Sequence, residues 1–343
     1  MDINKNNLVA CLNSFYKNES EGDFYPVYYG IEISRFCNFE CIMCPNPQYL
    51  PNEKGNMTFE VFTKIVDEIA PYAQIIKLHW IGEPLINKNI VKMIKYARAK
   101  TDAQLFMSTN GSLLKGKLAE EIRTSGLDKI IFSLDGNSKE SFEKIRIKGN
   151  FDEVVSNVHN FVEDVEKLGG PKCEVKIIQF ESNESEIEEF KKRWNTYKNT
   201  IVHVMWLSTW AGQLENLENL SSSLSPYASL KREACADLWF KMQFDWTGKV
   251  ALCCWDWSNK VILGDINVDT LKDIWQSEKI ISERKKHLSN QFLGICKNCT
   301  EWAKVEEYEF WYSYERLKEN ARMIWAGRGD SETLRVLKDS LGI

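Results

Sequence analysis

The residues with the most specific chemistry are three cysteines in the segment SRFCNFECIMCPNP, residues 34–47. Cys37, Cys41 and Cys44 follow the spacing C-x3-C-x2-C. A structural zinc site takes four ligands, and iron–sulfur clusters also normally take four thiolates. Either a distant fourth residue completes this site, or three thiolates hold a cluster whose remaining iron stays open for a ligand.

A second group of cysteines lies near the end of the chain. It comprises Cys235, Cys253, Cys254, Cys296 and Cys299. Thiols that cluster in a reducing compartment indicate metal binding or catalysis instead of disulfides. The two remaining cysteines, Cys11 and Cys173, are isolated in the sequence, and we expect both to be small buried hydrophobic residues.

Composition sets the broad class. The 343 residues carry a formal net charge of -5, so no basic excess points to nucleic acid or to an anionic membrane surface. The first 25 residues are polar and lack the apolar core of a signal peptide, and no later run is long enough to span a bilayer. We therefore expect a cytoplasmic protein with one large domain, or a large domain plus a small one.

The segments that must position the cysteines alternate between two sequence patterns. Amphipathic segments such as 58–72 and 151–169 repeat apolar residues at helical spacing. Between them lie six short β-branched and aromatic runs, at 27–34, 74–81, 104–110, 129–136, 174–180 and 201–209. This alternation predicts βα units and a parallel sheet. A closed eight-unit barrel needs about 250 residues, so we expect an α/β fold with an open, partial (β/α)6 TIM-like barrel. Its chemistry would lie at the carboxyl ends of the strands, where the three cysteines fall.

The motifs at the predicted strand ends resemble those of the radical S-adenosylmethionine (radical SAM) superfamily. C-x3-C-x2-C follows the first strand, and WIGEPL (80–85) after the second resembles the family's Gly-Gly-Glu motif, with Ile81 in place of the first glycine. STNG (108–111) and SLDG (133–136) end the third and fourth strands. The resemblance covers residues 27 to about 209.

This resemblance implies a [4Fe–4S] cluster on Cys37, Cys41 and Cys44 whose open iron chelates S-adenosylmethionine. Reductive cleavage would give a 5′-deoxyadenosyl radical that abstracts hydrogen from a substrate C–H bond, with reduced flavodoxin or ferredoxin as electron donor. The cofactor-binding residues would be Met43 near adenine, Gly82 and Glu83 at the methionine amine, Arg146 at the methionine carboxylate, and Ser108, Asn110, Ser133 and Asp135 at the ribose or substrate. Simpler roles also fit: turn residues at 108, 110 and 135, and a solvated helix residue at 146.

The second cysteine group resembles a SPASM module. Twelve residues separate Cys235 from Gly248, and four more precede Cys253. Thr247-Gly248 would be a hairpin turn, with a helix from about residue 269. Because the sequence holds no cysteine after Cys299, the module looks like the shortened twitch form, with one auxiliary [4Fe–4S] cluster. The ligands would be Cys235, Cys253, Cys296 and Cys299, and zinc on the same four residues is the alternative.

Cys254 is surplus to that ligand set. It could replace Cys253 as ligand, be a buried bystander, or act catalytically by donating a hydrogen atom to a substrate radical.

These readings divide the chain into four parts: an N-terminal extension (1–26), the partial barrel (27–225), the SPASM/twitch domain (226–310) and a C-terminal helical extension (311–343). The 36 residues before Cys37 are too few for a packed leader-binding domain. That favours a small-molecule substrate, such as a sugar or aminocyclitol, that is oxidised or epimerised. A peptide- or protein-modifying enzyme and a non-catalytic zinc-binding scaffold are the alternatives, and the oligomeric state is left open.

Overall fold

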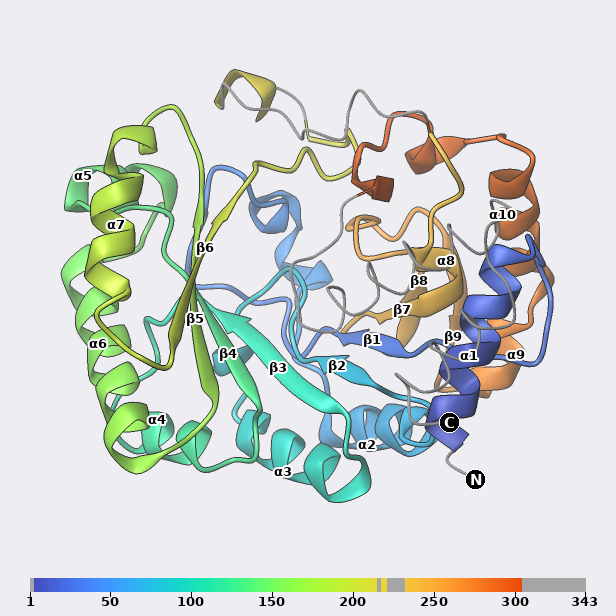
Figure 1. Cartoon of the computed structure of the whole chain (residues 1–343), viewed down its shortest axis with the longest axis horizontal. Helices are drawn as coiled ribbons and strands as arrows, with labels where there is room; N and C mark the ends of the chain where they lie inside the picture. The colour runs from blue at the N-terminus through green and yellow to red at the C-terminus, as the bar shows by residue number, and fades with distance from the viewer. Residues whose placement is uncertain (1–2, 215–216, 221–231, 304–343) are drawn as a thin grey trace, which may run out of the picture.

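The computed structural model describes residues 3–214, 217–220 and 232–303 (Figure 1). Six parallel strands lie side by side in chain order, as successive βα crossovers of one hand produce. They are β1 Tyr28–Ile31, β2 Ile75–Lys77, β3 Gln104–Thr109, β4 Lys129–Ser133, β5 Lys172–Ile178 and β6 Thr200–Met205. Within the described residues β6 is one edge of the sheet and remains unclosed, so the predicted partial barrel is confirmed.

Helices cover the outer face of this sheet (Figure 1). They are α2 Phe59–Ile69, α3 Ile90–Lys100, α4 Gly116–Arg123, α5 Lys139–Ile145, α6 Phe151–Leu168 and α7 Ile187–Trp194. Helix α2 begins where the Thr58 hydroxyl accepts a hydrogen bond from the Val61 backbone N–H. Phe62, Ile65 and Val66 are buried on one face of α2, as the helical spacing predicts.

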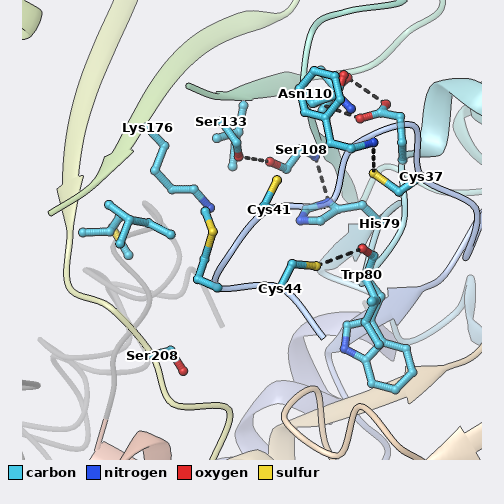
Figure 2. Close-up of a pocket in the computed structure, with 18 of the residues that line it drawn as sticks. Cys37, Cys41, Cys44, His79, Trp80, Ser108, Asn110, Ser133, Lys176 and Ser208 are labelled. Atoms are coloured by element: carbon cyan, nitrogen blue, oxygen red, sulfur yellow. Dashed lines mark hydrogen bonds between the residues drawn. The ribbon is translucent and has the colours of Figure 1, made fainter. Parts of the chain in front are cut away.

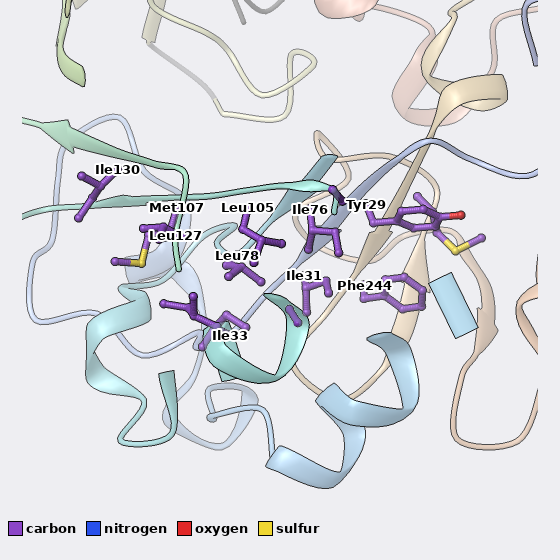
Figure 3. Close-up of a cluster of buried hydrophobic side chains, with 14 of the residues drawn as sticks. Tyr29, Ile31, Ile33, Ile76, Leu78, Leu105, Met107, Leu127, Ile130 and Phe244 are labelled. Atoms are coloured by element: carbon purple, nitrogen blue, oxygen red, sulfur yellow. The ribbon is translucent and has the colours of Figure 1, made fainter. Parts of the chain in front are cut away.

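The two faces of each strand differ in chemistry because successive side chains alternate. On the outer face, Ile76, Leu105, Met107 and Ile130 pack into the main hydrophobic core beneath the helices (Figure 3). The inner face carries polar residues at alternate positions, among them Lys77 between Ile76 and Leu78. The core thus fixes which side chains point into the barrel.

Strands end earlier than the sequence predicts. The second run ends at Lys77 instead of residue 81, and the sixth ends at Met205 instead of residue 209. The extra residues form loops at the carboxyl ends of the strands and line a cavity there. Their apolar and aromatic character therefore reflects the cavity and not the sheet.

The C-terminal module continues the same sheet. Strand β7 (Lys241–Phe244) pairs in parallel with β1, and β8 (Lys249–Ala251) and β9 (Ile262–Asp265) follow in antiparallel order. Gly248, with φ +96°, closes the predicted hairpin turn, and its N–H donates to the Asp245 carbonyl at 3.0 Å. Helices α8 (Asp237–Phe240), α9 (Leu271–Trp275) and α10 (Glu278–Leu288) complete the module.

Helix α1 (Ile3–Tyr16) packs against this module, although it is far away in sequence (Figure 1). The Phe15 ring lies 5.2 Å edge-on from that of Trp239, whose Nε1–H donates to the Glu19 carbonyl at 2.8 Å. Cys11 and, in the barrel, Cys173 are fully buried, as predicted. No described helix has the length and apolarity needed to cross a bilayer.

The predicted C-terminal helical extension (311–343) lies outside the described residues, as do the boundaries near 225 and 310. The four-part division of the chain therefore stays a prediction.

Candidate active site and auxiliary cluster site

The three-cysteine loop lies just beyond the carboxyl end of β1, at the mouth of the barrel. Two backbone hydrogen bonds anchor it to the end of α5 and the residues just after it: Glu40 N–H donates to Ile147 O at 2.9 Å, and Ile42 N–H to Ile145 O, at the last residue of α5, at 3.0 Å. The thiols of Cys37, Cys41 and Cys44 line one cavity of about 260 Å³ together with side chains from the strand ends (Figure 2). The C-x3-C-x2-C spacing in the sequence thus brings the three thiols to one cavity.

Each of these thiols has a donor nearby. Phe39 N–H points at the Cys37 sulfur at 3.4 Å, Asn46 N–H at the Cys44 sulfur at 3.4 Å, and Arg146 Nη1 at the Cys41 sulfur at 3.7 Å. Burial raises the pKa of Cys37 to about 12 and also raises the pKa of Cys41 and Cys44. Neutral thiols would therefore persist at physiological pH unless a metal supplied positive charge.

Gly82 allows the loop after β2 to touch the cysteine loop. A Cβ atom at this position would lie 2.1 Å from Ser34 O and 2.7 Å from Phe36 O, both rigid backbone atoms. Next to it, the buried Glu83 carboxylate accepts hydrogen bonds from the Leu85 and Asn110 N–H groups and from the Thr109 hydroxyl. Glu83 thus fastens the end of β2 to the end of β3. Burial raises its pKa, and these three hydrogen bonds oppose that rise.

The strand-end residues predicted from the motifs fall into two groups. Ser108 and Ser133 line the cavity with their hydroxyl oxygens 3.0 Å apart, and Asn110 lines it beside them (Figure 2). Asp135 instead is fully buried behind the wall, where it pairs with Arg146 and accepts the Ile178 N–H at 2.6 Å.

Arg146 is buried, which excludes the solvated-helix alternative. It lines the cavity, and its Nε–H, also buried, has no hydrogen-bond acceptor in the part of the chain that the structure describes. An unpaired guanidinium N–H in a buried site is costly unless a ligand accepts from it. The donor therefore suits an anionic acceptor on a ligand, such as a carboxylate.

The sequence motifs do not include the inner wall of the barrel. Lys77, His79, Glu174, Lys176 and His203 all line the cavity from β2, β5, β6 or the residues just after them. The sequence did contain a signal for these residues, because polar residues at every second position of an otherwise apolar strand mark its inner face.

The four auxiliary cysteines gather in the C-terminal module. Cys235 precedes α8, Cys253 follows β8, and Cys296 and Cys299 lie in the segment after α10. Burial raises the pKa of Cys235 and of Cys253. Asp237 and then Cys299 raise that of Cys235 further, and Cys254 and then Cys299 raise that of Cys253. Burial also raises the pKa of Cys296 to about 11 and that of Cys299 to about 12.

Cys254 diverges from its neighbour. It lines the barrel cavity with the three-cysteine loop. The Trp80 indole N–H holds this segment by donating to Cys254 O at 2.7 Å, and the Gln213 amide donates to Trp255 O at 2.7 Å. The auxiliary loop, the segment with Cys254 and Trp255 that follows β8, is therefore one wall of the cavity.

Both cysteine sets suit iron–sulfur clusters by their chemistry, because each offers partly or fully buried thiols as soft ligands. In the three-cysteine loop, N–H donors also point at sulfur. Among the described residues, no three Cys, His, Asp or Glu side chains close around the position of a single metal ion. A four-iron cluster is larger than one ion and takes its thiolates from around a cube.

Comparison with known proteins agrees with this chemistry. The model of the radical SAM superfamily matches residues 31–195, and that of the SPASM iron–sulfur cluster-binding domain matches residues 235–300. A tungsten-containing aldehyde ferredoxin oxidoreductase cofactor-modifying protein of Pyrococcus furiosus is 32% identical over 110 residues, which are 32% of this chain and 30% of that protein.

Two further likenesses extend over most of the chain. The S-adenosyl-L-methionine-dependent 2-deoxy-scyllo-inosamine dehydrogenase of Niallia circulans is 23% identical over 287 residues, 82% of this chain and 96% of that protein. The crystal structure of BtrN in complex with AdoMet and 2-DOIA superposes with a TM-score of 0.56 at 19% identity, over 84% of this chain and 98% of that one. At this identity the structural likeness concerns the fold.

Proposed function

Because the chain belongs to the radical SAM superfamily and carries a SPASM iron–sulfur domain, we propose that it is an oxidoreductase that removes hydrogen from a C–H bond of a small hydroxylated molecule. The observation that carries this proposal is the single cavity shared by the three-cysteine loop, the strand ends of the barrel and the auxiliary loop. Substrate, cofactor and both cysteine sets would meet there.

In this proposal each chain segment has a separate task. Cys37, Cys41 and Cys44 hold a [4Fe–4S] cluster, while the backbone at Gly82 and the guanidinium of Arg146 bind the amino and carboxylate groups of S-adenosylmethionine. When bound, this pair of cofactors supplies the 5′-deoxyadenosyl radical that abstracts hydrogen. Glu83 fixes the position of the Gly82 loop through its three hydrogen bonds.

Met43, Ser108, Asn110 and Ser133 would complete the cofactor pocket from positions that line the cavity. Asp135 acts indirectly, since it holds Arg146 in place. The expectation that Asp135 itself faces ribose or substrate is therefore replaced by a positioning role.

The auxiliary set, Cys235, Cys253, Cys296 and Cys299, would hold a second [4Fe–4S] cluster. When a hydroxyl-bearing substrate radical becomes a carbonyl product it releases one electron, which a nearby cluster can take up, and one proton, which passes to water. Reduced flavodoxin or ferredoxin would supply the electron that reduces the first cluster. A hydroxylated substrate, a sugar or aminocyclitol, is supported by the dehydrogenase relative, which this chain matches over nearly its whole length. A peptide substrate is the competing possibility.

Deuterium transfer tests the proposed reaction. Anaerobically reconstituted protein should contain about eight irons per chain, four for each cluster. With S-adenosylmethionine, a reductant and perdeuterated sugars, it should pass deuterium into 5′-deoxyadenosine and yield a carbonyl product. A colourless protein with stoichiometric zinc would refute the proposal, and deuterium transfer from peptides alone would refute the substrate class.

A second candidate, epimerisation, is favoured by the position of Cys254 in the cavity wall. A thiol there could return a hydrogen atom to the opposite face of a substrate radical. The thiyl radical left on Cys254 would then take an electron from the auxiliary cluster and a proton from water. Replacement Cys254→Ala should then preserve S-adenosylmethionine cleavage and abolish inversion. Unchanged inversion in this variant would eliminate the thiol as donor.

A further inference from the structure

The inner wall of the barrel carries positive charge at the depth where a substrate would bind. Lys77 is the last residue of β2, and Lys176 lies on β5 in register with Ser133 and His203. Figure 2 shows Lys176 and Ser133 in the cavity. Both lysines line the cavity, together with His79. They lie on the polar inner face because Ile76 and Leu78, on either side of Lys77, belong to the outer core.

His79 offers this wall a hydrogen-bond donor at Nε2. Its Nδ1 accepts the Ser108 backbone N–H at 2.8 Å, so the proton of the neutral imidazole is on Nε2. Burial, and then the charges of Lys77, Lys176 and Lys129, lower the pKa of His79 well below 6.5. The lowered pKa favours the neutral ring, whose Nε2–H is then its donor.

The carboxylates of the cavity are engaged elsewhere. Glu83 accepts three hydrogen bonds, and Glu174 lies 3.2 Å from Lys129 Nζ and 3.4 Å from His203 Nε2. No ion pair involves Lys77 among the residues that the structure describes. Lys77 therefore lines the cavity without a salt-bridge partner among the described residues.

We propose that the substrate carries an oxyanion, a carboxylate or a phosphate, which Lys77 and Lys176 bind, with the Nε2–H of His79 as a further donor. This inference rests on the proposed function, because it names the substrate class of that same cavity. It favours a sugar acid or a sugar phosphate over a cationic aminocyclitol, whose ammonium would face like charge.

Nuclear magnetic resonance of small probes tests the assignment without the substrate. The protein would carry both clusters and saturating S-adenosylhomocysteine, which fills the cofactor site and is not cleaved. Inorganic phosphate and acetate represent the two oxyanions, and methylammonium represents the cation. The reduced clusters are paramagnetic, so they broaden the resonances of a probe held in the cavity more than the oxidised clusters do.

The reduction-dependent broadening should appear for phosphate, acetate or both, which identifies the oxyanion, and should be absent for methylammonium. Lys77→Met and Lys176→Met should each weaken apparent probe affinity by about tenfold, and Lys77→Arg by less than about threefold, since the charge is kept. Lys117→Met is the matched control, because that side chain is 86% exposed on α4.

Two results would overturn the inference: broadening of methylammonium as strong as that of acetate, or phosphate broadening that both methionine variants leave unchanged. Reductive cleavage of S-adenosylmethionine, measured on the same preparations, separates the two levels of the proposal. If the wild-type protein does not cleave S-adenosylmethionine, the proposed function is wrong. If it cleaves S-adenosylmethionine but broadens the oxyanion probes no more than methylammonium, only the proposed role of the lysines is wrong. Loss of S-adenosylmethionine binding in Lys77→Met would assign that lysine to the cofactor and also overturn the inference.

Discussion

Gly82→Ala should damage the cofactor site through backbone contact alone. The new Cβ would lie 2.1 Å from Ser34 O, 2.7 Å from Phe36 O and 2.8 Å from the Arg35 carbonyl carbon, and all three atoms are backbone. Because such contacts stay above 3.0 Å in real structures, the loop after β2 must retreat from the cysteine loop by about 0.9 Å, the difference between 3.0 and 2.1 Å.

The size of the effect follows from that displacement. Overpacking of this kind costs about 1–3 kcal/mol of unfolding free energy. A shift near 1 Å between cofactor-binding groups can lower turnover by about 100-fold. We therefore expect a modest drop in thermal stability, retention of iron, and a loss of S-adenosylmethionine cleavage far greater than the stability change explains.

Thermal unfolding, iron content and 5′-deoxyadenosine formation would be measured on wild type, Gly82→Ala and Gly116→Ala. Gly116 has φ +55° and no heavy atom within 4 Å of a built Cβ, so its replacement tests backbone strain without steric contact. That control should lose about 1 kcal/mol of stability and keep its activity. Wild-type cleavage by Gly82→Ala would refute the close-contact reasoning.

Three further predictions concern the rest of the molecule. Cys253→Ser should lose about four of eight irons whereas Cys254→Ser keeps them; equal iron contents would undo the ligand assignment. Arg284 donates to Leu238 O at 2.9 Å and to Ser20 O at 3.1 Å in a buried site. Arg284→Met would leave both carbonyls without this donor and should lower the unfolding free energy by about 2 kcal/mol. An unchanged midpoint of chemical denaturation would contradict this. Burial and then the charge of Arg193 lower the pKa of His159, so near this pKa the folded protein binds fewer protons than the unfolded chain. The free energy of unfolding should therefore fall as pH drops below 6.5, and His159→Gln should make that fall less steep. An equally steep fall in the variant would contradict the reasoning.

Local sequence patterns were sufficient to predict the order of the helices and strands and the position of the cysteine loop. Apolar residues at helical spacing predicted α2 and α6, and the Thr247-Gly248 pair predicted the hairpin turn, because these signals act within a few residues. The parallel pairing of β1 with β7 joins segments about 210 residues apart, and no local preference specifies it. The first 25 residues read as polar, yet α1 packs onto the auxiliary module through one apolar face that includes Leu8, Cys11 and Leu12.

The candidate site was predictable to the extent that it depends on motifs. Gly82 was identified from its motif, but its physical reason, contact with the Ser34 carbonyl, needed coordinates. The Arg146–Asp135 pair depends on how separate segments meet in the folded barrel, which a single segment cannot reveal. The lysines of the inner wall, in contrast, follow the alternation along their own strands, and only the cavity that they share needed coordinates. Ligation of iron by the seven cysteines stays a prediction.

The central claim is that three thiolates hold a cluster with one iron open for S-adenosylmethionine. Its most direct measurement is 5′-deoxyadenosine formation by anaerobically reconstituted, reduced protein, compared with Cys41→Ala. The wild type should cleave S-adenosylmethionine, and the variant should keep its auxiliary irons while cleaving none. Intact S-adenosylmethionine in a wild-type sample with both clusters loaded, or undiminished cleavage in Cys41→Ala, would contradict the account.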